Sequence, residues 1–302
     1  MLEPIYIVGP TAAGKSEVAA ELGAMIRGEI IGADAFQVYR GLDLLTAKPG
    51  PAIRTRVPHH LIGEIPLTQN FDVEQYRRLA SARIDEIARR GHVPVIVGGT
   101  GLYVRALTHG LASLPSGHEK LRAQFASQSF EELQQRLQEL DPVGAAQIDL
   151  KNPRRVIRAL EVCVLTGRPF SSFRSQTAPS APVRGVLLGL ERDVLRQRIV
   201  SRTDQMFSAG VIEEVRRVDE ISMTAQEAIG FREVQDLIKG EIDELECRRR
   251  ITIQTQQYAK RQITWFRRSA DWHTLKLNKD EPPVATASRV AEALGLSASP
   301  SA

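Results

Sequence analysis

Short apolar runs alternate along the chain with stretches in which apolar residues recur every three or four positions. The apolar runs have the length of buried strands, and we expect strands at Ile5–Val8, Glu29–Ala33, Val93–Val97, Val186–Leu190 and Trp272–Leu277. The periodic stretches predict helices at Lys15–Arg27, Asp72–Arg90, Gly101–His109 and Arg192–Ala209. Strands that alternate with helices predict an α/β fold, in which helices cover both faces of a parallel sheet.

Segment Pro115–Pro179 interrupts this alternation, because it has helical patterns and no clear strand. Its helix-like pieces are Glu119–Gln128, Phe130–Leu140 and Asn152–Thr166. We therefore expect an inserted all-helical subdomain at residues 113–179. The loop Gln176–Pro182, rich in Pro and Ser, would return the chain to the core.

The remaining residues form the expected core domain, which comprises residues 1–112 and 180–296. A long basic helix is expected near its end, from Glu241 to Arg268. Residues 297–302 have low complexity, and we expect a disordered tail there.

The strongest motif lies between the first expected strand and the first expected helix. It has the pattern G-x-x-x-x-G-K-[ST], and its residues are Gly9, Pro10, Thr11, Ala12, Ala13, Gly14, Lys15 and Ser16. In such a P-loop, backbone N–H groups point at phosphate oxygens, the lysine adds positive charge and the hydroxyl can hold Mg²⁺. The motif is one that binds ATP, and the fold it predicts is a P-loop NTPase-like sheet. The alternative is a glycine-rich turn without a ligand, which the flanking strand and helix disfavour.

Two other strand ends carry candidate chemistry, because the carboxyl ends of parallel strands face the ligand crevice. Asp34 follows the second expected strand and could bind Mg²⁺ or accept a proton, although a turn or helix cap is the common role of aspartate. Thr100 follows the third main strand, where a hydrolytic P-loop ATPase usually has an acid. Thr100 could orient a polar group or cap the next helix. The missing acid counts against an ATP-driven motor.

Basic residues gather on two expected helices. Arg154, Arg155 and Arg158 lie on a helix of the insertion. The long C-terminal helix carries Arg248, Arg249, Arg250, Lys260, Arg261, Arg267 and Arg268, and no acid lies between Arg248 and Ala270. Because ordinary solvated helices mix both signs of charge, this composition favours contact with a nucleic-acid backbone over a plain solvated face.

Arg198 and Arg202 form a further pair, four residues apart on one expected helix. Such a pair could close over a diphosphate, and the alternative is a pair of surface arginines.

The overall composition fits a soluble globular chain. Of 302 residues, 42% are hydrophobic and 25% charged, and the net charge of +4 suits an anionic partner only weakly. Cys163 and Cys247 fit neither a metal pair nor a disulfide framework, so we expect reduced thiols and a cytoplasmic protein. No stretch has the length of a membrane span, and the start of the chain has no pattern of a signal peptide.

These motifs together resemble bacterial tRNA dimethylallyltransferase. The resembling blocks keep the order of that family from Pro4 to Arg268: Gly9–Ser16, Asp34–Tyr39, Leu42-Asp43 with Thr46–Pro49, Gly98–Tyr103, Asn152–Val162, Ile229–Arg232 and Ala259–Arg267. The chain departs from the family at Ala35, where a serine is usual, and at Gly63, where an acid is frequent.

The resemblance implies that a dimethylallyl group moves from dimethylallyl diphosphate to N6 of the adenine 3′ of the anticodon in tRNA. Diphosphate leaves and no ATP is consumed. The P-loop, with Lys15 and with Mg²⁺ on Ser16, would stabilise the leaving diphosphate, and Thr11 and Arg202 would be further ligands. Asp34, helped by Thr100, would activate the adenine amine as acceptor and base.

The resemblance also implies the residues that contact the anticodon stem-loop of tRNA. They are Asp34, Ala35, Phe36, Gln37, Arg154, Arg155, Val156, Ile157, Arg158, Gly230, Phe231, Arg232, Lys260 and Arg261. The target base would flip out of its stack to reach a buried site, and we expect the protein to act as a monomer.

Three other functions compete with this interpretation. A prenyltransferase of free adenine nucleotides would share the catalytic core, and the basic clusters that suit tRNA argue against it. A small-molecule P-loop kinase would use the same loop for ATP, with Arg198 and Arg202 as a lid. A nucleic-acid-binding module without catalysis would have no use for the P-loop and Asp34.

Overall fold

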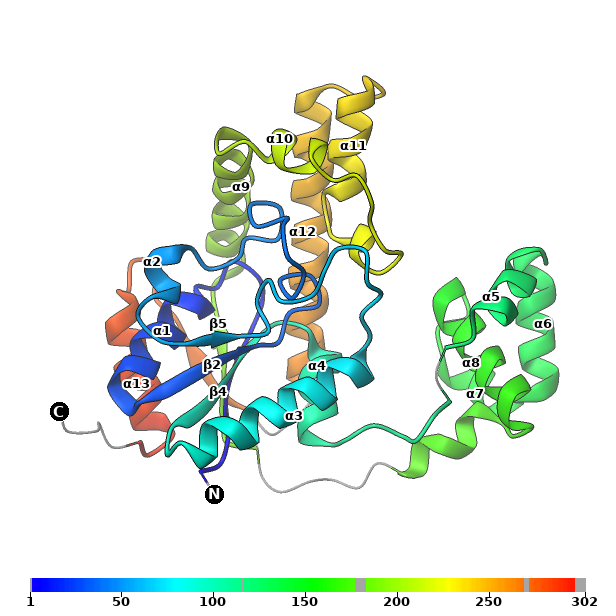
Figure 1. The fold of residues 1–302 in the computed structure, drawn as a ribbon, viewed down its shortest axis with the longest axis horizontal. Helices are drawn as coiled ribbons and strands as arrows, with labels where there is room; N and C mark the ends of the chain where they lie inside the picture. Colours follow the sequence, from blue (N-terminus) through cyan, green and yellow to red (C-terminus); the bar gives the residue numbers. More distant parts are fainter. Residues whose placement is uncertain (1, 116, 177–182, 269–271, 297–302) are drawn as a thin grey trace. The chain divides into compact units, whose positions relative to one another are not determined.

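A computed structural model of the chain describes residues 2–115, 117–176, 183–268 and 272–296 (Figure 1). Within these residues a six-stranded sheet has the order β3-β2-β4-β1-β5-β6, with every pairing parallel. The strands are β1 (Ile5–Val8), β2 (Gly28–Gly32), β3 (His59–His60), β4 (Val93–Gly98), β5 (Gly185–Gly189) and β6 (His273–Lys276). The parallel α/β sheet is thus confirmed, and only the two-residue β3 lacks a counterpart among the expected strands.

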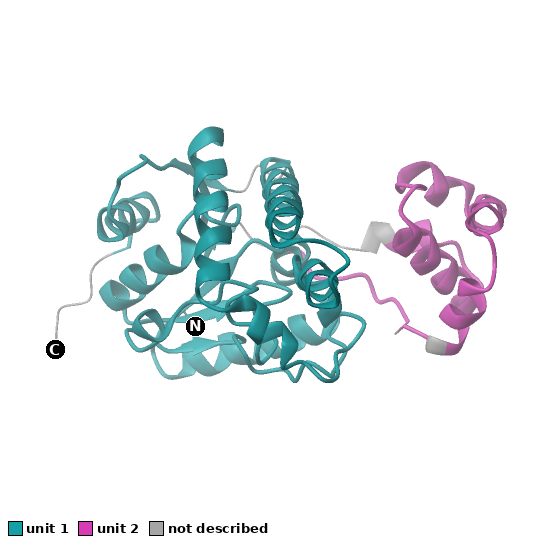
Figure 2. Cartoon of the chain, turned by 90° about the horizontal axis from the view of Figure 1, so that it is seen from above, with its two compact units in different colours: residues 1–108, 181–302 teal, residues 109–180 magenta. Residues whose placement is uncertain are grey.

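The chain divides into two compact units, residues 1–108 with 181–302 and residues 109–180 (Figure 2). The helices of the first unit are α1 (Lys15–Ile26), α2 (Pro51–Arg54), α3 (Val73–Arg89), α4 (Gly101–Thr108), α9 (Arg192–Ser208), α10 (Val211–Arg216), η2 (Ala225–Glu227), α11 (Phe231–Lys239), α12 (Glu244–Arg267) and α13 (Pro283–Ala293). The expected bounds of the core domain were 1–112 and 180–296. The expected tail, residues 297–302, lies outside the described residues.

The second unit contains helices and no strand among its described residues. Its elements are α5 (Glu119–Ala126), α6 (Phe130–Leu140), α7 (Pro142–Gln147), α8 (Pro153–Thr166) and η1 (Phe170–Gln176). Phe125, Leu133, Leu137, Val156 and Leu160 form its own buried core. The sequence patterns predict α5, α6 and α8 but miss the short α7. The expected loop after Gln176, residues 177–182, lies outside the described residues.

The two faces of the sheet have separate cores, because side chains alternate along each strand. Tyr6 and Val8 of β1 pack in one layer with residues of α3 and α4. Ile5 and Ile7 pack in the opposite layer with residues of α1 and α13. Figure 1 shows α1 and α13 on one side of the sheet and α3 and α4 on the other. Helices cover both faces, as the sequence predicts.

The strand order places the P-loop at the centre of the sheet. The chain leaves β1 toward β2, β3 and β4 on one side, and later adds β5 and β6 on the other. In doubly wound sheets this change of direction creates the ligand crevice at the carboxyl ends of the strands. Val8, the last residue of β1, is level with Gly98 of β4, so the strand ends that carry the motifs meet at one edge.

Helices α9 and α12 pack against each other beyond this edge, through Leu195, Ile199 and Ala259. A third apolar cluster joins the loop after β2 to α9, α10, α11 and α12, and its members include Leu45, Phe207, Phe231 and Ile251. Of these elements, the loop after β2, α9 and α12 contribute residues to the walls of the crevice.

A buried carboxylate stabilises β2 at the other end of the strand. Glu29 is only 3% exposed and accepts hydrogen bonds from Arg90. The His60 and His92 rings also lie within hydrogen-bond distance of its carboxylate oxygens. Burial alone would raise the pKa of Glu29, but these partners hold that pKa down at about 2.

We expect acid to destabilise the fold through Glu29. A carboxyl whose pKa is lower in the folded than in the unfolded chain adds stability above the unfolded pKa, and this stability is lost as pH falls toward the folded pKa. The free energy of unfolding should therefore fall by about 3 kcal/mol between pH 5 and pH 2 through this group. Denaturant titrations across that range would measure it.

The matched control is Glu74, which pairs with Arg77 on the exposed surface of α3. Glu29→Gln should remove the share of the pH dependence that Glu29 contributes, while Glu74→Gln should leave the pH dependence as in the wild type, because exposed ion pairs contribute little. Equal pH profiles for the wild type and Glu29→Gln would contradict the assignment.

Candidate active site

The P-loop bends around the N-terminal end of α1 in a conformation that needs glycine at two points. Gly9 has φ +152° and runs so close to β5 that a Cβ there would lie 2.6 Å from the Leu188 carbonyl oxygen. Gly14 is the N-terminal cap of α1 with φ +83°, in the left-handed region. The helix therefore begins with unpaired N–H groups that face the crevice, as anion-binding loops require.

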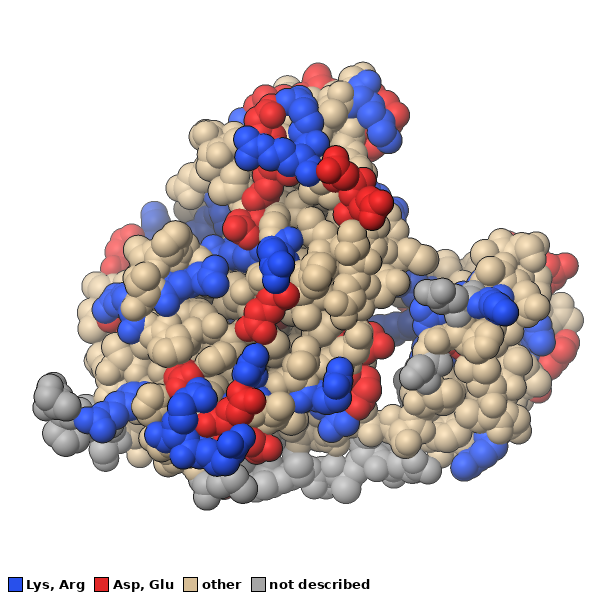
Figure 3. Space-filling view, in the orientation of Figure 1, with Lys and Arg blue, Asp and Glu red and all other residues tan. Residues whose placement is uncertain are grey.

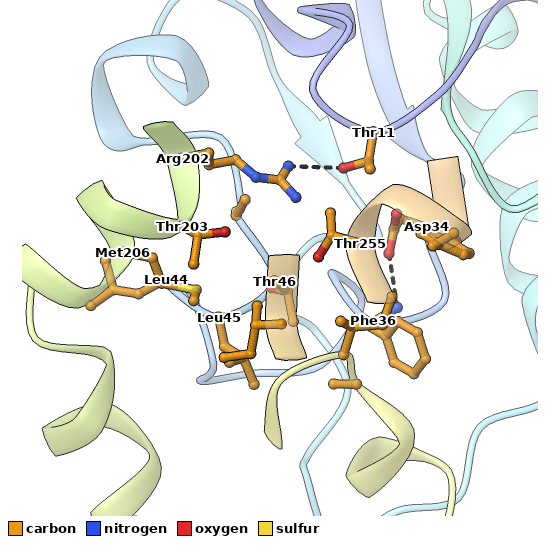
Figure 4. A pocket seen from close by; sticks show the side chains of 15 residues that line it. Thr11, Asp34, Phe36, Leu44, Leu45, Thr46, Arg202, Thr203, Met206 and Thr255 are labelled. Carbon is orange, nitrogen blue, oxygen red and sulfur yellow. Dashed lines mark hydrogen bonds between the residues drawn. The ribbon is translucent and has the colours of Figure 1, made fainter. Parts of the chain in front are cut away.

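Two cationic side chains lie over the loop. The Lys15 Nζ donates a hydrogen bond to the Pro10 carbonyl oxygen at 2.7 Å. Arg202 of α9 donates through Nη1 to the Thr11 hydroxyl at 2.8 Å (Figure 4). Burial lowers the pKa of Lys15 to about 8, and the nearby Asp34 carboxylate partly opposes this shift. Arg202, predicted as a diphosphate ligand, thus lies at the P-loop.

Arg198 also lies beside the loop but makes a different contact. Its Nη2 donates to the Lys279 carbonyl oxygen at 2.8 Å, and Nη1 is 3.8 Å from the Cβ position of Gly14. Both arginines line the P-loop cavity, which excludes the interpretation of a pair on the open surface. Of the two, only Arg202 donates to a P-loop side chain.

Two cavities meet at this point. The P-loop cavity has a volume of about 620 Å³ and is lined by Thr11–Ser16, Asp34, Lys48, Arg198, Arg202 and Gln262 among others. A smaller cavity of about 60 Å³ shares Thr11, Asp34, Ala47 and Arg202 with it. Its other walls include the apolar Leu44, Leu45 and Met206 (Figure 4) together with Ile229 and Ile251, and we call it the apolar cavity for these side chains. Thr46, Thr203, Thr255 and Tyr258 also line it. The charged P-loop cavity therefore adjoins the apolar cavity, and Asp34 is the carboxylate that lines both.

Asp34 is both a turn residue and a cavity residue. Its Oδ1 accepts from the Phe36 and Gln37 N–H groups at 3.0 and 3.3 Å, which is the turn-capping role. Its Oδ2 has no hydrogen bond within the described part of the chain, and the side chain lines both cavities. One oxygen thus fixes the side chain, and the other remains available to a ligand.

Thr100 fixes the backbone next to Asp34. Its hydroxyl oxygen accepts from the Ala35 N–H at 3.0 Å and is 3.5 Å from the Tyr258 hydroxyl. Gly98 and Gly99 before it have no room for a side chain, since a Cβ would lie 2.1 Å from the Ala33 carbonyl oxygen and 2.0 Å from the Gln262 amide nitrogen, respectively. The glycines therefore allow β4, the loop after β2 and α12 to converge around Asp34.

Gln262 is a site residue that the sequence patterns do not single out. It is 4% exposed, and its Oε1 accepts from the P-loop Thr11 N–H at 2.8 Å. Thr255 and Tyr258 lie seven and four residues earlier on the same helix and line the apolar cavity. This spacing of polar residues on the inward face of α12 is the signal that could have revealed them.

Some side chains expected to contact tRNA are fully buried. Val156 is 0% exposed in the core of the second unit, and Phe231 is 1% exposed in the cluster around Ile251. Gly230 is also buried and has φ +95°. The side chains of Val156 and Phe231 therefore pack inside the protein, and tRNA contact at these positions stays a prediction.

Several expected arginine contacts are occupied by carboxylates. Arg158 pairs with Glu161 and donates to the Pro115 carbonyl oxygen. Arg232 pairs with Glu227.

The basic triplet at the start of α12 is neutralised in the same way. Arg248 pairs with Glu244 and Asp204, and Arg249 and Arg250 both pair with Glu246. Figure 3 shows acidic and basic side chains together where α11 and α12 meet. The acid-free run of sequence is therefore not a uniformly free basic face, because acids of the preceding turn reach it.

Other members of the expected tRNA set remain exposed or lie at the crevice. Lys260 and Arg261 are exposed and form no ion pair within the described residues, and the Arg261 guanidinium lies 5.8 Å from the centre of the Tyr258 ring. Arg155 is exposed as well, while Ile157 and Ala35 are half-buried. Phe36 lines the apolar cavity and Gln37 the P-loop cavity.

The described residues contain no group of three or more His, Cys, Asp or Glu arranged to hold a metal ion. Ser16 lines the P-loop cavity and is the candidate metal ligand of the loop. Among the helices that the structure describes, none combines the length and the apolar character needed to cross a bilayer.

Comparison with known proteins identifies close relatives over nearly the whole chain. Residues 37–269 match the family described as IPP transferase. A tRNA dimethylallyltransferase of Akkermansia muciniphila is 40% identical over 96% of this chain and 99% of its own length. One from Geobacter metallireducens is 43% identical over 88% of this chain and 90% of its own length.

Solved structures agree with these matches. The full-length tRNA isopentenylpyrophosphate transferase of Bacillus halodurans is 35% identical, with a TM-score of 0.69 over 98% of this chain and 97% of that one. A eukaryotic dimethylallyltransferase acting on tRNA shares the fold with a TM-score of 0.81 over 96% of this chain and 78% of that one, at 24% identity.

Proposed function

The chain belongs to the IPP transferase family, and we propose that it is a tRNA dimethylallyltransferase. The enzyme transfers the dimethylallyl group of dimethylallyl diphosphate to N6 of the adenine that follows the anticodon of tRNA, and it releases diphosphate. The observation that carries this proposal is the junction of the two cavities. Thr11, Asp34 and Arg202 line both the phosphate-binding chamber and the apolar chamber, so a diphosphate, a short apolar group and a carboxylate can meet there.

The donor end of the reaction needs stabilisation of growing negative charge. As the bond between the allylic carbon and oxygen breaks, both electrons of that bond go to the diphosphate. Lys15 and Arg202 lie at the P-loop, and together with the N–H groups at the start of α1 they would stabilise that charge. The apolar side chains around Leu44 and Ile251 would surround the electron-poor allyl group and so limit its hydrolysis.

The acceptor end needs a base, because the adenine amine is a weak nucleophile. The nitrogen lone pair forms the new bond to the allylic carbon, and the amine then loses a proton. Asp34 is the general base that accepts this proton, since its Oδ2 makes no hydrogen bond in the turn. Thr100 acts on Asp34 indirectly, because it fixes the neighbouring Ala35 backbone.

The residues present fit Mg²⁺ bound together with the substrate. This ion accepts oxygen ligands, keeps several waters and is commonly held by a few protein groups plus substrate phosphates. Ser16 supplies such an oxygen at the P-loop cavity. We therefore propose Ser16 as the protein ligand of Mg²⁺, which would supply further charge stabilisation to the diphosphate.

The acceptor base must leave its stack to reach Asp34, so we propose base flipping of the tRNA. We also propose that the protein acts as a monomer. The buried free thiols Cys163 and Cys247, together with a tRNA substrate, support a cytoplasmic location.

The deciding experiment gives the purified protein labelled dimethylallyl diphosphate and Mg²⁺, together with unmodified tRNA, AMP or ATP in separate reactions. Label in tRNA alone supports the proposal. Label in AMP would instead identify a prenyltransferase of free nucleotides. Turnover of ATP without prenyl transfer would identify a kinase or an ATPase.

We expect tRNA binding to weaken steeply with salt, because cations that contact phosphates release counterions from the RNA. Lys260→Ala/Arg261→Ala should reduce the slope of log Kd against log salt by about 1.5, since each phosphate contact contributes about 0.7 to 0.9. The matched control is Arg249→Ala/Arg250→Ala, which removes arginines already paired with Glu246 and should change the slope little. Filter-binding titrations would measure both, and a salt-independent wild-type Kd would contradict the prediction.

A further inference from the structure

One loop forms walls of both cavities and has a conformation that is unfavourable by itself. Residues 44–47 line the apolar cavity, and Ala47 and Lys48 line the P-loop cavity. Leu42 and Ala47 have φ of +52° and +51°, in the left-handed region that residues with a Cβ seldom adopt. Such conformations cost free energy and persist only where surrounding contacts fix them.

Local contacts fix the two ends of this loop. The Thr46 hydroxyl donates to the Leu42 carbonyl oxygen, and the Lys48 ammonium donates to the Gly41 carbonyl and to Asp43. The Gln37 side-chain amide donates to the Thr46 and Ala47 carbonyl oxygens at 3.1 and 2.9 Å. None of these contacts reaches the N–H groups of Leu44 and Leu45 in the middle of the loop.

A carboxylate from a distant part of the sequence binds those two N–H groups. Glu214 of α10 accepts from the Leu44 N–H through Oε1 at 2.8 Å and from the Leu45 N–H through Oε2 at 2.9 Å. Both oxygens are engaged, in charge-assisted bonds that are stronger than neutral ones. Leu45 is 7% exposed and packs with Phe207 and Ile251, so the carboxylate fixes the backbone from which an apolar wall residue projects.

We propose that Glu214 is a positioning residue for prenyl transfer: its carboxylate clamps the middle of the 42–48 loop, and so sets the shape of the apolar chamber against the donor. Glu214 itself is absent from the lining of both cavities, so it acts through Leu44 and Leu45. The inference rests on the proposed function, since it assigns a prenyl group to that chamber. Loss of the clamp should weaken donor use and leave tRNA affinity unchanged.

The neighbouring Glu213 offers a matched control. It lies on the same helix, is exposed and pairs with Arg216 one turn further along. Glu214→Gln has nearly the shape of the native side chain but replaces one acceptor oxygen by an NH₂ group, which faces a backbone donor. Glu214→Ala removes both acceptors. Glu213→Gln removes a charge from α10 without touching the loop.

The experiment measures KM for dimethylallyl diphosphate, kcat, tRNA Kd and melting temperature for the wild type and these three variants. We expect kcat/KM for the donor to fall by about 10- to 100-fold in both Glu214 variants, because leaving the Leu44 and Leu45 donors unpaired makes the native loop conformation rarer by about that factor. The tRNA Kd should stay within about twofold of the wild type, and Glu213→Gln should match the wild type throughout. Hydrogen exchange should show slow amide exchange at Leu44 and Leu45 in the wild type and faster exchange in Glu214→Gln.

Two results would overturn the inference while leaving the proposed function intact. One is wild-type kcat/KM for the donor in Glu214→Gln, and the other is fast amide exchange at Leu44 and Leu45 in the active wild type. A wild type that transfers no prenyl group to tRNA would instead refute the proposed function. Amide exchange at Leu44 and Leu45 would then still show whether Glu214 fixes the loop. If Glu214→Ala does not fold, Glu214→Gln alone decides between these outcomes.

Discussion

Asp34→Asn is expected to lower kcat by about 10²- to 10⁴-fold, the range typical of losing a general base, while tRNA affinity stays near that of the wild type. The prediction follows from the two roles of the side chain. Oδ1 accepts from the Phe36 and Gln37 N–H groups, and Oδ2 remains available in the cavity. Asparagine retains a carbonyl oxygen for the turn but cannot take a proton from the adenine amine.

Comparison with Asp34→Ala separates catalysis from turn capping. If Asp34 only caps the turn, Asp34→Asn should be almost as active as the wild type and Asp34→Ala should be impaired. If Asp34 is the base, both variants should lose activity to a similar extent. Single-turnover transfer to tRNA, with tRNA Kd measured separately, would distinguish these results. A large loss of affinity with normal turnover would remove Asp34 from the chemistry.

The features that sequence predicts correctly are those that depend on local pattern. The P-loop requires only neighbouring residues, because its strand, glycines and helix are consecutive in the chain. Asp34 and Thr100 are predicted from position, since strand ends of a parallel sheet converge whatever the intervening segments do. Asp34, Thr100 and the P-loop do converge, through the Ala35 contact to Thr100 and the register between β1 and β4.

The features that sequence misses depend on long-range pairing. Gln262 accepts from the P-loop Thr11 N–H across 251 residues, and Glu214 accepts from Leu44 across 170. Helical spacing can place Gln262 on the inward face of α12, but no local pattern specifies the partner of either side chain, because many glutamines and glutamates lie at similar helix positions. The β3 strand is missed for another reason, since its two residues pair only because β2 is already in the sheet.

Other corrections were within reach of helical spacing. Arg248 and Arg250 follow Glu244 and Glu246 by four residues, the spacing at which acid and base pair on one helix face. The acid-free run after Arg248 therefore overestimates the free positive charge of α12, because Glu244 and Glu246 lie just before that run. Val156 precedes the buried Leu160 by four residues on α8, which indicates an inward face. Resemblance marked Val156 as part of a tRNA-contacting block, whereas periodicity marks it as core.

Lys15→Met is expected to lower kcat/KM for dimethylallyl diphosphate by about 10²- to 10³-fold, the usual cost of losing one group that stabilises charge in the transition state. The wild type should also show a specific pH dependence. Burial lowers the pKa of Lys15 to about 8, so the ammonium loses its proton as pH rises past that value. Because an anion binds the protonated form, diphosphate affinity should be full below pH 8 and fall by up to about tenfold per pH unit above it.

Calorimetric titration with inorganic diphosphate and Mg²⁺ from pH 6.5 to 9.5 would measure this dependence. Lys15→Met has no charge at this position, so its affinity changes with pH only through the ionisation of diphosphate and the other groups. Lys15→Arg keeps a positive charge throughout the range. We expect the diphosphate affinity of the wild type to approach that of Lys15→Met as pH rises. The curve of affinity against pH for Lys15→Arg should stay parallel to the curve for Lys15→Met. Parallel curves for the wild type and Lys15→Met would show that the lysine charge does not bind diphosphate. Diphosphate binding in the P-loop cavity would then depend on backbone N–H groups and on its other cationic residues, Lys48, Arg198 and Arg202.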